Sequence, residues 1–332
     1  MLADQEANKV VRNQVTSGAA GGGEFWALAG VLAYSAGYLF DRIAVKNADP
    51  IVGPLIHGMP NLVLGIVLVA SKRTYRQLNP SGPGYIGIRA ILSFVIPGVL
   101  ATLGLLAYYF ALRLGGIAIT IPVQQTYIIW GALVGWLYLG ERIGRISAIG
   151  IGILMIGLFV LALGQMHGVP VSNSWYYAVP LALVAAAAYG ISGVLWRDGQ
   201  LRGADTSTGI LIQYIVSEIT ALACVMGFGR FHLLLHAPKG QVEALLTSGV
   251  LAGVIAVYCV FTSLRLMSVA RTYTFFSLLS PVSAILAYLF LRENINWQMG
   301  AGILIVCAGV VVAEKFKPAG QKAQVLMTVK EL

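Results

Sequence analysis

Long runs of apolar residues, separated by short polar connections, make up most of this chain. A helix needs about 20 such residues to cross the hydrocarbon core of a bilayer. The runs are continuous, whereas the strands of a membrane barrel alternate polar with apolar positions. The pattern therefore predicts an all-α integral membrane protein with ten transmembrane helices. Their expected limits are 25–45, 51–71, 90–112, 115–139, 146–165, 175–196, 207–228, 244–264, 270–291 and 296–313.

The polar segments are too short to fold on their own. A tail at 1–24 precedes the first expected helix, and a second tail at 314–332 follows the last. Neither tail, nor the longer loops at 72–89 and 229–243, has enough residues to bury a core. We therefore expect no attached enzymatic or nucleic-acid-binding domain.

Composition and charge agree with a membrane protein and suggest its orientation. Hydrophobic residues form 58% of the chain and charged residues 11%, against about 25% charged residues in soluble domains. The net charge is +9, and sixteen Lys and Arg fall on the side of the two tails against six on the other side. Positively charged loops stay in the cytoplasm. We expect a multi-pass protein of the inner (cytoplasmic) membrane with both termini cytoplasmic, so the charge does not indicate nucleic acid.

The second half of the chain repeats the first. With a shift of 152 residues, 112–160 aligns without a gap to 264–312, and 15 of the 49 positions are identical. This predicts two five-helix repeats, 25–165 and 166–313. Because five is odd, the second repeat is expected to be inverted, an architecture typical of secondary transporters. Glu141 and its copy Glu293 then lie in tight turns on opposite faces, where we interpret their charges as marks of the membrane interface.

Several stretches carry a resemblance to a known family: AYSAGYLFDR at 33–42, AYGISGVLWR at 188–197 and LLSPVSAILAYLFLRE at 278–293. The chain resembles the ten-helix EamA-type members of the drug/metabolite transporter superfamily. The resemblance implies a secondary transporter, either an exporter or an importer, of small polar metabolites such as amino acids, and we take export as the first hypothesis. It implies no cofactor. Two departures leave the substrate open: Tyr34-Ser35 replaces an aromatic-Gly pair, and Ile128-Ile129 stands where Ser-Pro is expected.

Other functions of such a chain are weighed against transport. An organic-cation, drug or organic-acid carrier of the same fold remains an alternative. An intramembrane enzyme would need a cluster of His, Asp or Cys, and a passive channel fits an inverted repeat less well. His232 and His236 are four apart, but no full ligand set accompanies them, so we expect no metal site.

Glu218 is the strongest candidate for a substrate-binding residue. It is the one acid near the middle of an expected span, where a charge costs roughly 3 kcal/mol on insertion scales. It must face a cavity, be paired, or be protonated. Tyr214 lies one turn before it on the same face. We hypothesise that Glu218 binds a substrate amine or exchanges a proton; the alternative is a structural carboxyl bonded to a neighbouring helix.

Polar residues at matching positions of the two repeats suggest further contacts with substrate. His57 and Asn61 lie on one stripe of the second helix and correspond to Gln213 and Ser217 in the seventh. Hydrogen bonds between helices are the alternative interpretation. A histidine at this depth could also couple transport to protons, and that coupling remains open.

The fourth and first helices offer the remaining candidates. Pro122 removes a backbone hydrogen bond and predicts a bent or broken helix. On helical spacing, Gln125 faces the cavity and Gln124 a packing surface. An aromatic lining is expected from Tyr34, Tyr38 and Tyr189, with core packing as the alternative. We expect a cavity bounded by helices 1, 2, 4, 6, 7 and 9, while monomer and homodimer are equally compatible with the sequence.

Overall fold

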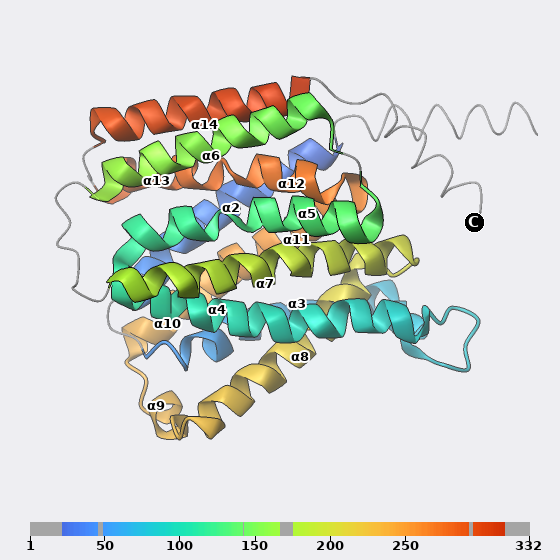
Figure 1. Ribbon diagram of the computed structural model, residues 1–332. Helices are drawn as coiled ribbons and strands as arrows, with labels where there is room; N and C mark the ends of the chain where they lie inside the picture. The colour runs from blue at the N-terminus through green and yellow to red at the C-terminus, as the bar shows by residue number, and fades with distance from the viewer. Residues whose placement is uncertain (1–21, 46–48, 142, 167–174, 292–294, 316–332) are drawn as a thin grey trace, which may run out of the picture.

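The computed structural model describes residues 22–45, 49–141, 143–166, 175–291 and 295–315, and every regular element in them is a helix. Most of the long helices lie side by side in a bundle, and α8 crosses them obliquely (Figure 1). In the described part of the chain, seven segments are long and apolar enough to cross a membrane. They are Gly53–Lys72, Gly87–Leu114, Arg145–Gly164, Tyr176–Leu201, Thr206–Gly227, Lys239–Leu266 and Val269–Phe290.

The described residues of the first half of the chain form five helices and a short 3₁₀ turn. They are α2 (Gly22–Val45), α3 (Gly53–Lys72), η1 (Thr74–Leu78), α4 (Gly87–Gln124), α5 (Tyr127–Leu139) and α6 (Arg145–Met166). The second half contains α7 (Trp175–Leu201), α8 (Thr206–Gly227), α9 (Phe231–Leu235), α10 (Lys239–Ser248), the π-helical segment η2 (Gly249–Ile255), α11 (Ala256–Leu266), α12 (Val269–Phe276), α13 (Leu279–Leu291) and α14 (Trp297–Lys315).

Helix α4 is not straight, although its helical assignment is continuous. Ala111, in its middle, and Val123, near its end, pack in the same small cluster with Ala178 and Ala182 of α7. In a straight helix Ala111 and Val123 would be about 18 Å apart. The chain therefore reverses direction between them, where the sequence predicts the connection between its third and fourth helices.

Helices α6 and α14 pack against each other at the edge of the bundle (Figure 1) through glycines that recur in both. A Cβ on Gly150 or Gly157 of α6 would lie 2.5 and 2.6 Å from backbone nitrogens of α14. A Cβ on Gly302 or Gly309 of α14 would meet α6 as closely. The missing side chains let the two backbones approach. Gly150 matches Gly302, and Gly157 matches Gly309, under the 152-residue shift. Equivalent helices of the two repeats therefore pack against each other through equivalent glycines.

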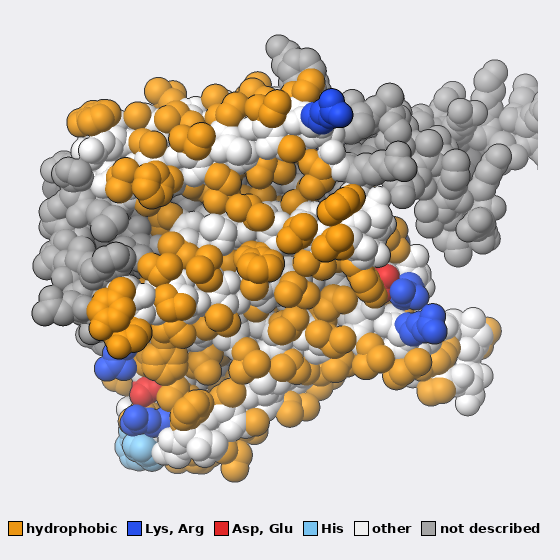
Figure 2. Space-filling model, in the orientation of Figure 1, with side chains coloured by type: hydrophobic (Ala, Val, Ile, Leu, Met, Phe, Trp, Pro, Cys, Tyr) orange, Lys and Arg blue, Asp and Glu red, His pale blue; other side chains and the backbone are white. Residues whose placement is uncertain are grey.

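The outer surface of the bundle is apolar around its middle. Figure 2 shows hydrophobic side chains across the visible face, with acidic and basic groups near its two ends. Leu137, Phe290 and Leu304 are each about two-thirds or more exposed. Side chains of this kind are stable at a surface when lipid covers it. The surface is that of a multi-pass membrane protein.

Candidate functional site

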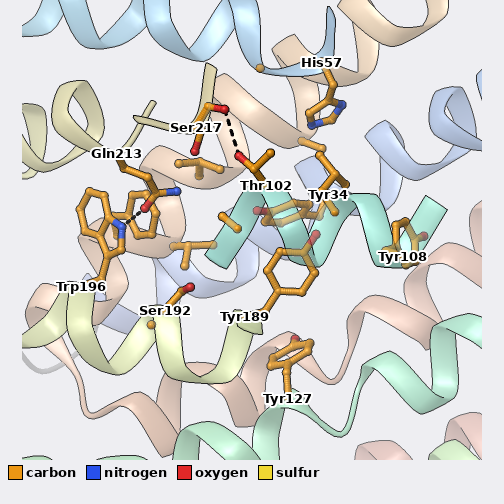
Figure 3. Close-up of a pocket in the computed structure, with 18 of the residues that line it drawn as sticks. Tyr34, His57, Thr102, Tyr108, Tyr127, Tyr189, Ser192, Trp196, Gln213 and Ser217 are labelled. Carbon is orange, nitrogen blue, oxygen red and sulfur yellow. Dashed lines mark hydrogen bonds between the residues drawn. The ribbon is translucent and has the colours of Figure 1, made fainter. Parts of the chain in front are cut away.

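A cavity with a volume of about 190 Å³ lies inside the bundle, between residues of both halves of the chain. Side chains from α2, α3, α4, α7 and α8 point toward it (Figure 3). Residues of α5, η2, α11, α12 and α13 complete the wall. No described residue of α6 or α14 lines it, as the sequence predicts for helices 5 and 10. Helices 3 and 8 contribute Thr102, Tyr108, Val257 and Phe261, and the sequence prediction omitted both.

Glu218 lies in the cavity wall, and the described lining contains no Lys or Arg that could pair with it. The residue is 8% exposed. Its Oε1 atom occupies space left by Gly58 of α3, since a Cβ there would lie 1.8 Å from that oxygen. Its Oε2 atom has no hydrogen-bond partner among the described residues. Tyr214, one turn earlier on α8, lines the same cavity. The predicted pair therefore faces the cavity together.

A second acid, Asp41, lies toward the connection between α2 and α3. Its Oδ1 atom is 3.5 Å from His57 Nδ1 and accepts a hydrogen bond from the Tyr109 hydroxyl at 3.4 Å. Both Asp41 and His57 line the cavity. The predicted site residue His57 is thus one member of a buried acid–imidazole pair.

Seven tyrosines surround the space between these acids: Tyr34, Tyr38, Tyr108, Tyr127, Tyr189, Tyr214 and Tyr273. The rings of Tyr38 and Tyr108 are stacked with centroids 6.3 Å apart, and Tyr127 meets Tyr273 edge to face at 4.8 Å. The Tyr273 hydroxyl donates to the Tyr189 carbonyl at 2.9 Å. The predicted lining residues Tyr34, Tyr38 and Tyr189 are among them.

Gln213 also reaches the cavity, beside a tryptophan that the sequence analysis did not select. Its Oε1 atom accepts a hydrogen bond from the Trp196 indole N–H, which Figure 3 shows at one end of the cavity. Trp196 is fully buried and stacks on Phe261. The sequence contained one signal for Trp196: it lies seven residues after Tyr189 on α7, so the two large aromatic side chains share a face of that helix.

Two candidates, Asn61 and Gln125, are not part of the described lining. Asn61 is fully buried against Gly253 of η2, and Gln125 donates to the Ser280 hydroxyl at 3.1 Å. Gln124 lines the cavity instead. The expected orientations of Gln124 and Gln125 are therefore wrong. Helix α4 ends at Gln124, so the helical spacing that was used to orient Gln125 does not continue through it.

The break in the fourth predicted helix is confirmed, and a matching break interrupts the ninth. The first separates α4 from α5 at Gln125 and Thr126, and the second separates α12 from α13 at Ser277 and Leu278. These positions correspond under the 152-residue shift. Residues on both sides of each break line the cavity, including Gln124, Tyr127, Phe276 and Leu279. Interrupted helices at equivalent positions of two repeats commonly mark transporter binding sites.

A buried ion pair lies next to Trp196, at one end of the cavity. Arg197 Nε lies 2.5 Å from Glu141 Oε1, and the two side chains are 14% and 12% exposed. The same guanidinium donates to the carbonyls of Leu264 and Met267, and Glu141 accepts from the Val269 N–H at 3.1 Å. Burial raises the pKa of Glu141, and the charge of Arg197 opposes that rise. The interpretation of Glu141 as an interface charge is incomplete, because its carboxylate connects the two halves.

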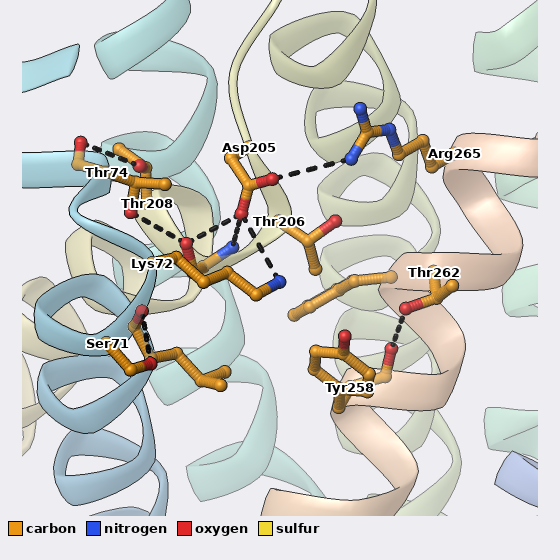
Figure 4. A network of polar contacts seen from close by, with 12 residues as sticks. Ser71, Lys72, Thr74, Asp205, Thr206, Thr208, Tyr258, Thr262 and Arg265 are labelled. Atoms are coloured by element: carbon orange, nitrogen blue, oxygen red, sulfur yellow. Dashed lines mark hydrogen bonds and ion pairs between the residues drawn. The ribbon is translucent and has the colours of Figure 1, made fainter.

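Further charged contacts lie near this end: Lys72–Asp205 (Figure 4) and Glu24–Arg271 join the two halves, and Arg265–Asp205 lies within the second half. Asp205 lies 3.8 Å from Lys72 Nζ and 3.5 Å from an Arg265 nitrogen, and Glu24 pairs with Arg271. Asp205 also caps α8 by accepting from the Ser207 N–H at 2.9 Å. Partial burial opposes ionisation of Asp205, but the bonds from Ser207 and the two cations outweigh it and lower its pKa.

Comparisons with known proteins agree with this architecture. The model of the EamA-like transporter family matches residues 21–163 and 176–314, one match in each half. A curated relative from a Sinorhizobium species, described as "Uncharacterized transporter in cobO 3'region", is 26% identical over 139 residues, which are 42% of this chain and 95% of the relative. A solved crystal structure shares the fold with a TM-score of 0.70 and 15% identity, over 88% of this chain and 96% of that one.

Proposed function

The chain belongs to the EamA-like transporter family of the drug/metabolite transporter superfamily and is a transporter, not an enzyme; from this premise we propose that it is a secondary transporter of a small polar metabolite. The substrate crosses through the central cavity by alternating access. The observation that carries this proposal is a cavity lined by residues of both repeats, next to two equivalent helix breaks. Such breaks leave backbone groups available to a ligand at the membrane midplane.

The proposed topology has ten spans in two inverted five-helix repeats, with both termini cytoplasmic in the inner membrane. The reversal of α4 between Ala111 and Val123 supports two passes within that one helix. The ion pairs of Lys72, Arg197, Arg265 and Arg271 all lie at one end of the bundle. Positive residues concentrate on the cytoplasmic side, so this is the cytoplasmic end.

In this topology the structure represents a state that is closed toward the cytoplasm. Opening that side requires Glu141 to separate from Arg197, and Lys72 from Asp205, because each pair joins one half to the other. Separation exposes the charges to water, which solvates them as the contact is lost. Movement of one repeat against the other then turns the cavity toward the opposite face.

Substrate contacts are assigned to the lining candidates Glu218, Tyr214, Gln213, His57, Tyr34, Tyr38 and Tyr189. Asn61 and Gln125 support the wall from behind. Amino acids or related compounds are the first substrates to test, with export as the direction and an organic-cation or organic-acid carrier as the alternative. The Asp41–His57 contact is the candidate for proton coupling. The protein acts as a monomer or homodimer.

Counterflow in proteoliposomes tests this function. Vesicles are loaded with one unlabelled compound from a panel of amino acids, amines and organic acids, and uptake of a trace of the labelled compound is followed. A carrier gives a transient, saturable accumulation above equilibrium for at least one compound. Unsaturable flux would indicate a channel, and neither signal with any compound would contradict the proposal.

A further inference from the structure

The charges that face the cavity all have one sign, apart from a single histidine. The described lining contains two carboxylic acids, Asp41 and Glu218, and neither Lys nor Arg. The one basic group in the lining, His57, is already 3.5 Å from Asp41. The buried guanidinium of Arg197 pairs with Glu141 and is not part of the described lining. The cavity therefore attracts positive charge and offers no free cation to a carboxylate.

Glu218 provides an open position for such a charge. More than nine-tenths of the residue is buried, and its Oε2 atom lacks a hydrogen-bond partner among the described groups. A carboxylate in these surroundings is costly unless something pairs with it. Ser217 and Thr102, its polar neighbours, donate to backbone carbonyls of Gly98 and Ser217. The carboxyl group of Glu218 is therefore available to pair with a positively charged ligand.

The surfaces around this carboxyl suit the body of an organic cation. Tyr214 lies one turn away, and Tyr34, Tyr38, Tyr108 and Tyr189 line the same cavity. Cations bind the faces of aromatic rings, and quaternary ammonium groups do so especially well when desolvated. Rings also pack against an aromatic or apolar body.

Resting on the function proposed above, we propose that the substrate is an organic cation, an aromatic or methylated amine without a carboxylate. Its charged nitrogen pairs with Glu218, and its body lies among the tyrosines. A zwitterionic amino acid binds less well because its carboxylate would face Asp41 and find no Lys or Arg in the lining. An organic acid meets the same two carboxyl groups without any compensating pair. The proposal narrows the substrate to the cationic class.

Four probes with similar bodies separate these charge types: tyramine and benzyltrimethylammonium as cations, tyrosine as a zwitterion, and 3-(4-hydroxyphenyl)propionate as an anion. Their binding to the full chain in detergent is measured by calorimetry. At least one cation is expected to bind, at least about tenfold more tightly than tyrosine or the anion. In Glu218→Gln, which keeps the shape of the side chain, its affinity drops at least about tenfold.

Glu243→Gln is the matched control, because Glu243 is 64% exposed on α10, pairs with Lys239 at 3.9 Å and is not among the lining residues. It should bind the cations as the unaltered protein does. Tighter binding of tyrosine or the anion, binding of no probe, or full affinity in a folded Glu218→Gln protein would each overturn the cationic assignment. Counterflow of an amino acid or organic acid would then still uphold the transport function, whereas the absence of counterflow with every compound would remove that function itself.

Discussion

Glu218 and Gly58 illustrate how single residues define the site. The importance of Glu218 was predictable because it is the one carboxylate near the middle of an expected span, and a charge at such depth is costly unless it is paired or faces a cavity. Gly58 was not, because a glycine in an apolar helix usually serves packing. Only the fold brings α3 so close that Glu218 Oε1 occupies the position of the missing Cβ.

Replacing Gly58 by Ala should therefore disturb the acid without removing it. The new Cβ would lie 1.8 Å from Glu218 Oε1, so the carboxyl must move away from α3. We expect substrate counterflow to fall about tenfold or more, a loss of at least about 1.4 kcal/mol of binding. Gly227→Ala, where no atom lies within 4 Å of the added carbon, is the control on α8. Unchanged counterflow in Gly58→Ala would contradict the role assigned to the carboxyl.

A substitution at Asp205 can remove the charge of this residue and keep its helix-capping hydrogen bond. Asn caps a helix as well as Asp does, so Asp205→Asn keeps the bond to the Ser207 N–H and removes the attraction to Lys72 and Arg265. Because these partially exposed pairs are weak, we expect a loss of about 0.2–1 kcal/mol at pH 7.

The pH dependence of that loss follows from the lowered pKa of Asp205. A folded-state pKa below the unfolded one stabilises the protein above the unfolded pKa, about 3.9, and this stabilisation disappears as the pH falls through the folded pKa. The difference in Tm between Asp205→Asn and the unaltered protein should therefore shrink below about pH 4. A difference that grows on acidification would contradict this assignment.

At the scale of helices, hydropathy correctly predicted a membrane protein made of helices, because the bilayer sets the length of an apolar helix, and seven described segments are long and apolar enough to cross it. It failed where helices are interrupted. The sequence predicted a break near Pro122 but oriented Gln125 as if the helix continued, and Gln124 took the place in the lining. It did not predict the π-helical segment Gly249–Ile255, since that irregularity depends on contacts with α3 at His57 and Asn61.

The contact between α6 and α14 allows a matched test of packing. Gly157→Ala would place a Cβ 2.6 Å from the Val306 nitrogen, whereas Gly152→Ala on the same helix meets nothing within 4 Å. Both changes favour the helical conformation equally. Overpacking should cost Gly157→Ala about 1–3 kcal/mol and lower its Tm by a few degrees, while Gly152→Ala leaves Tm unchanged or higher. Equal Tm values for both variants would show that this contact does not hold the edge of the bundle.

At the scale of the whole molecule, the repeat was predictable from 15 identities in 49 positions, and each half has its own family match. The closure between the halves was not predictable. Glu141 and Arg197 are 56 positions apart, and only their folded contact at 2.5 Å connects them. No pattern of hydropathy contains that information, because it depends on how α7 approaches the turn after α5.

The central claim is that one cavity faces the two sides of the membrane in turn. Ser192 lines the cavity, so Ser192→Cys, in a chain whose Cys224, Cys259 and Cys307 are replaced by Ser, reports its accessibility. The measurement is the rate of reaction with a membrane-impermeant thiol reagent in right-side-out and inside-out vesicles. We predict reaction from both sides, and that adding Glu141→Gln, which weakens the pair with Arg197, raises the cytoplasmic rate while lowering the external one. Reaction from one side in every variant, or rates that rise together on both sides, would contradict alternating access.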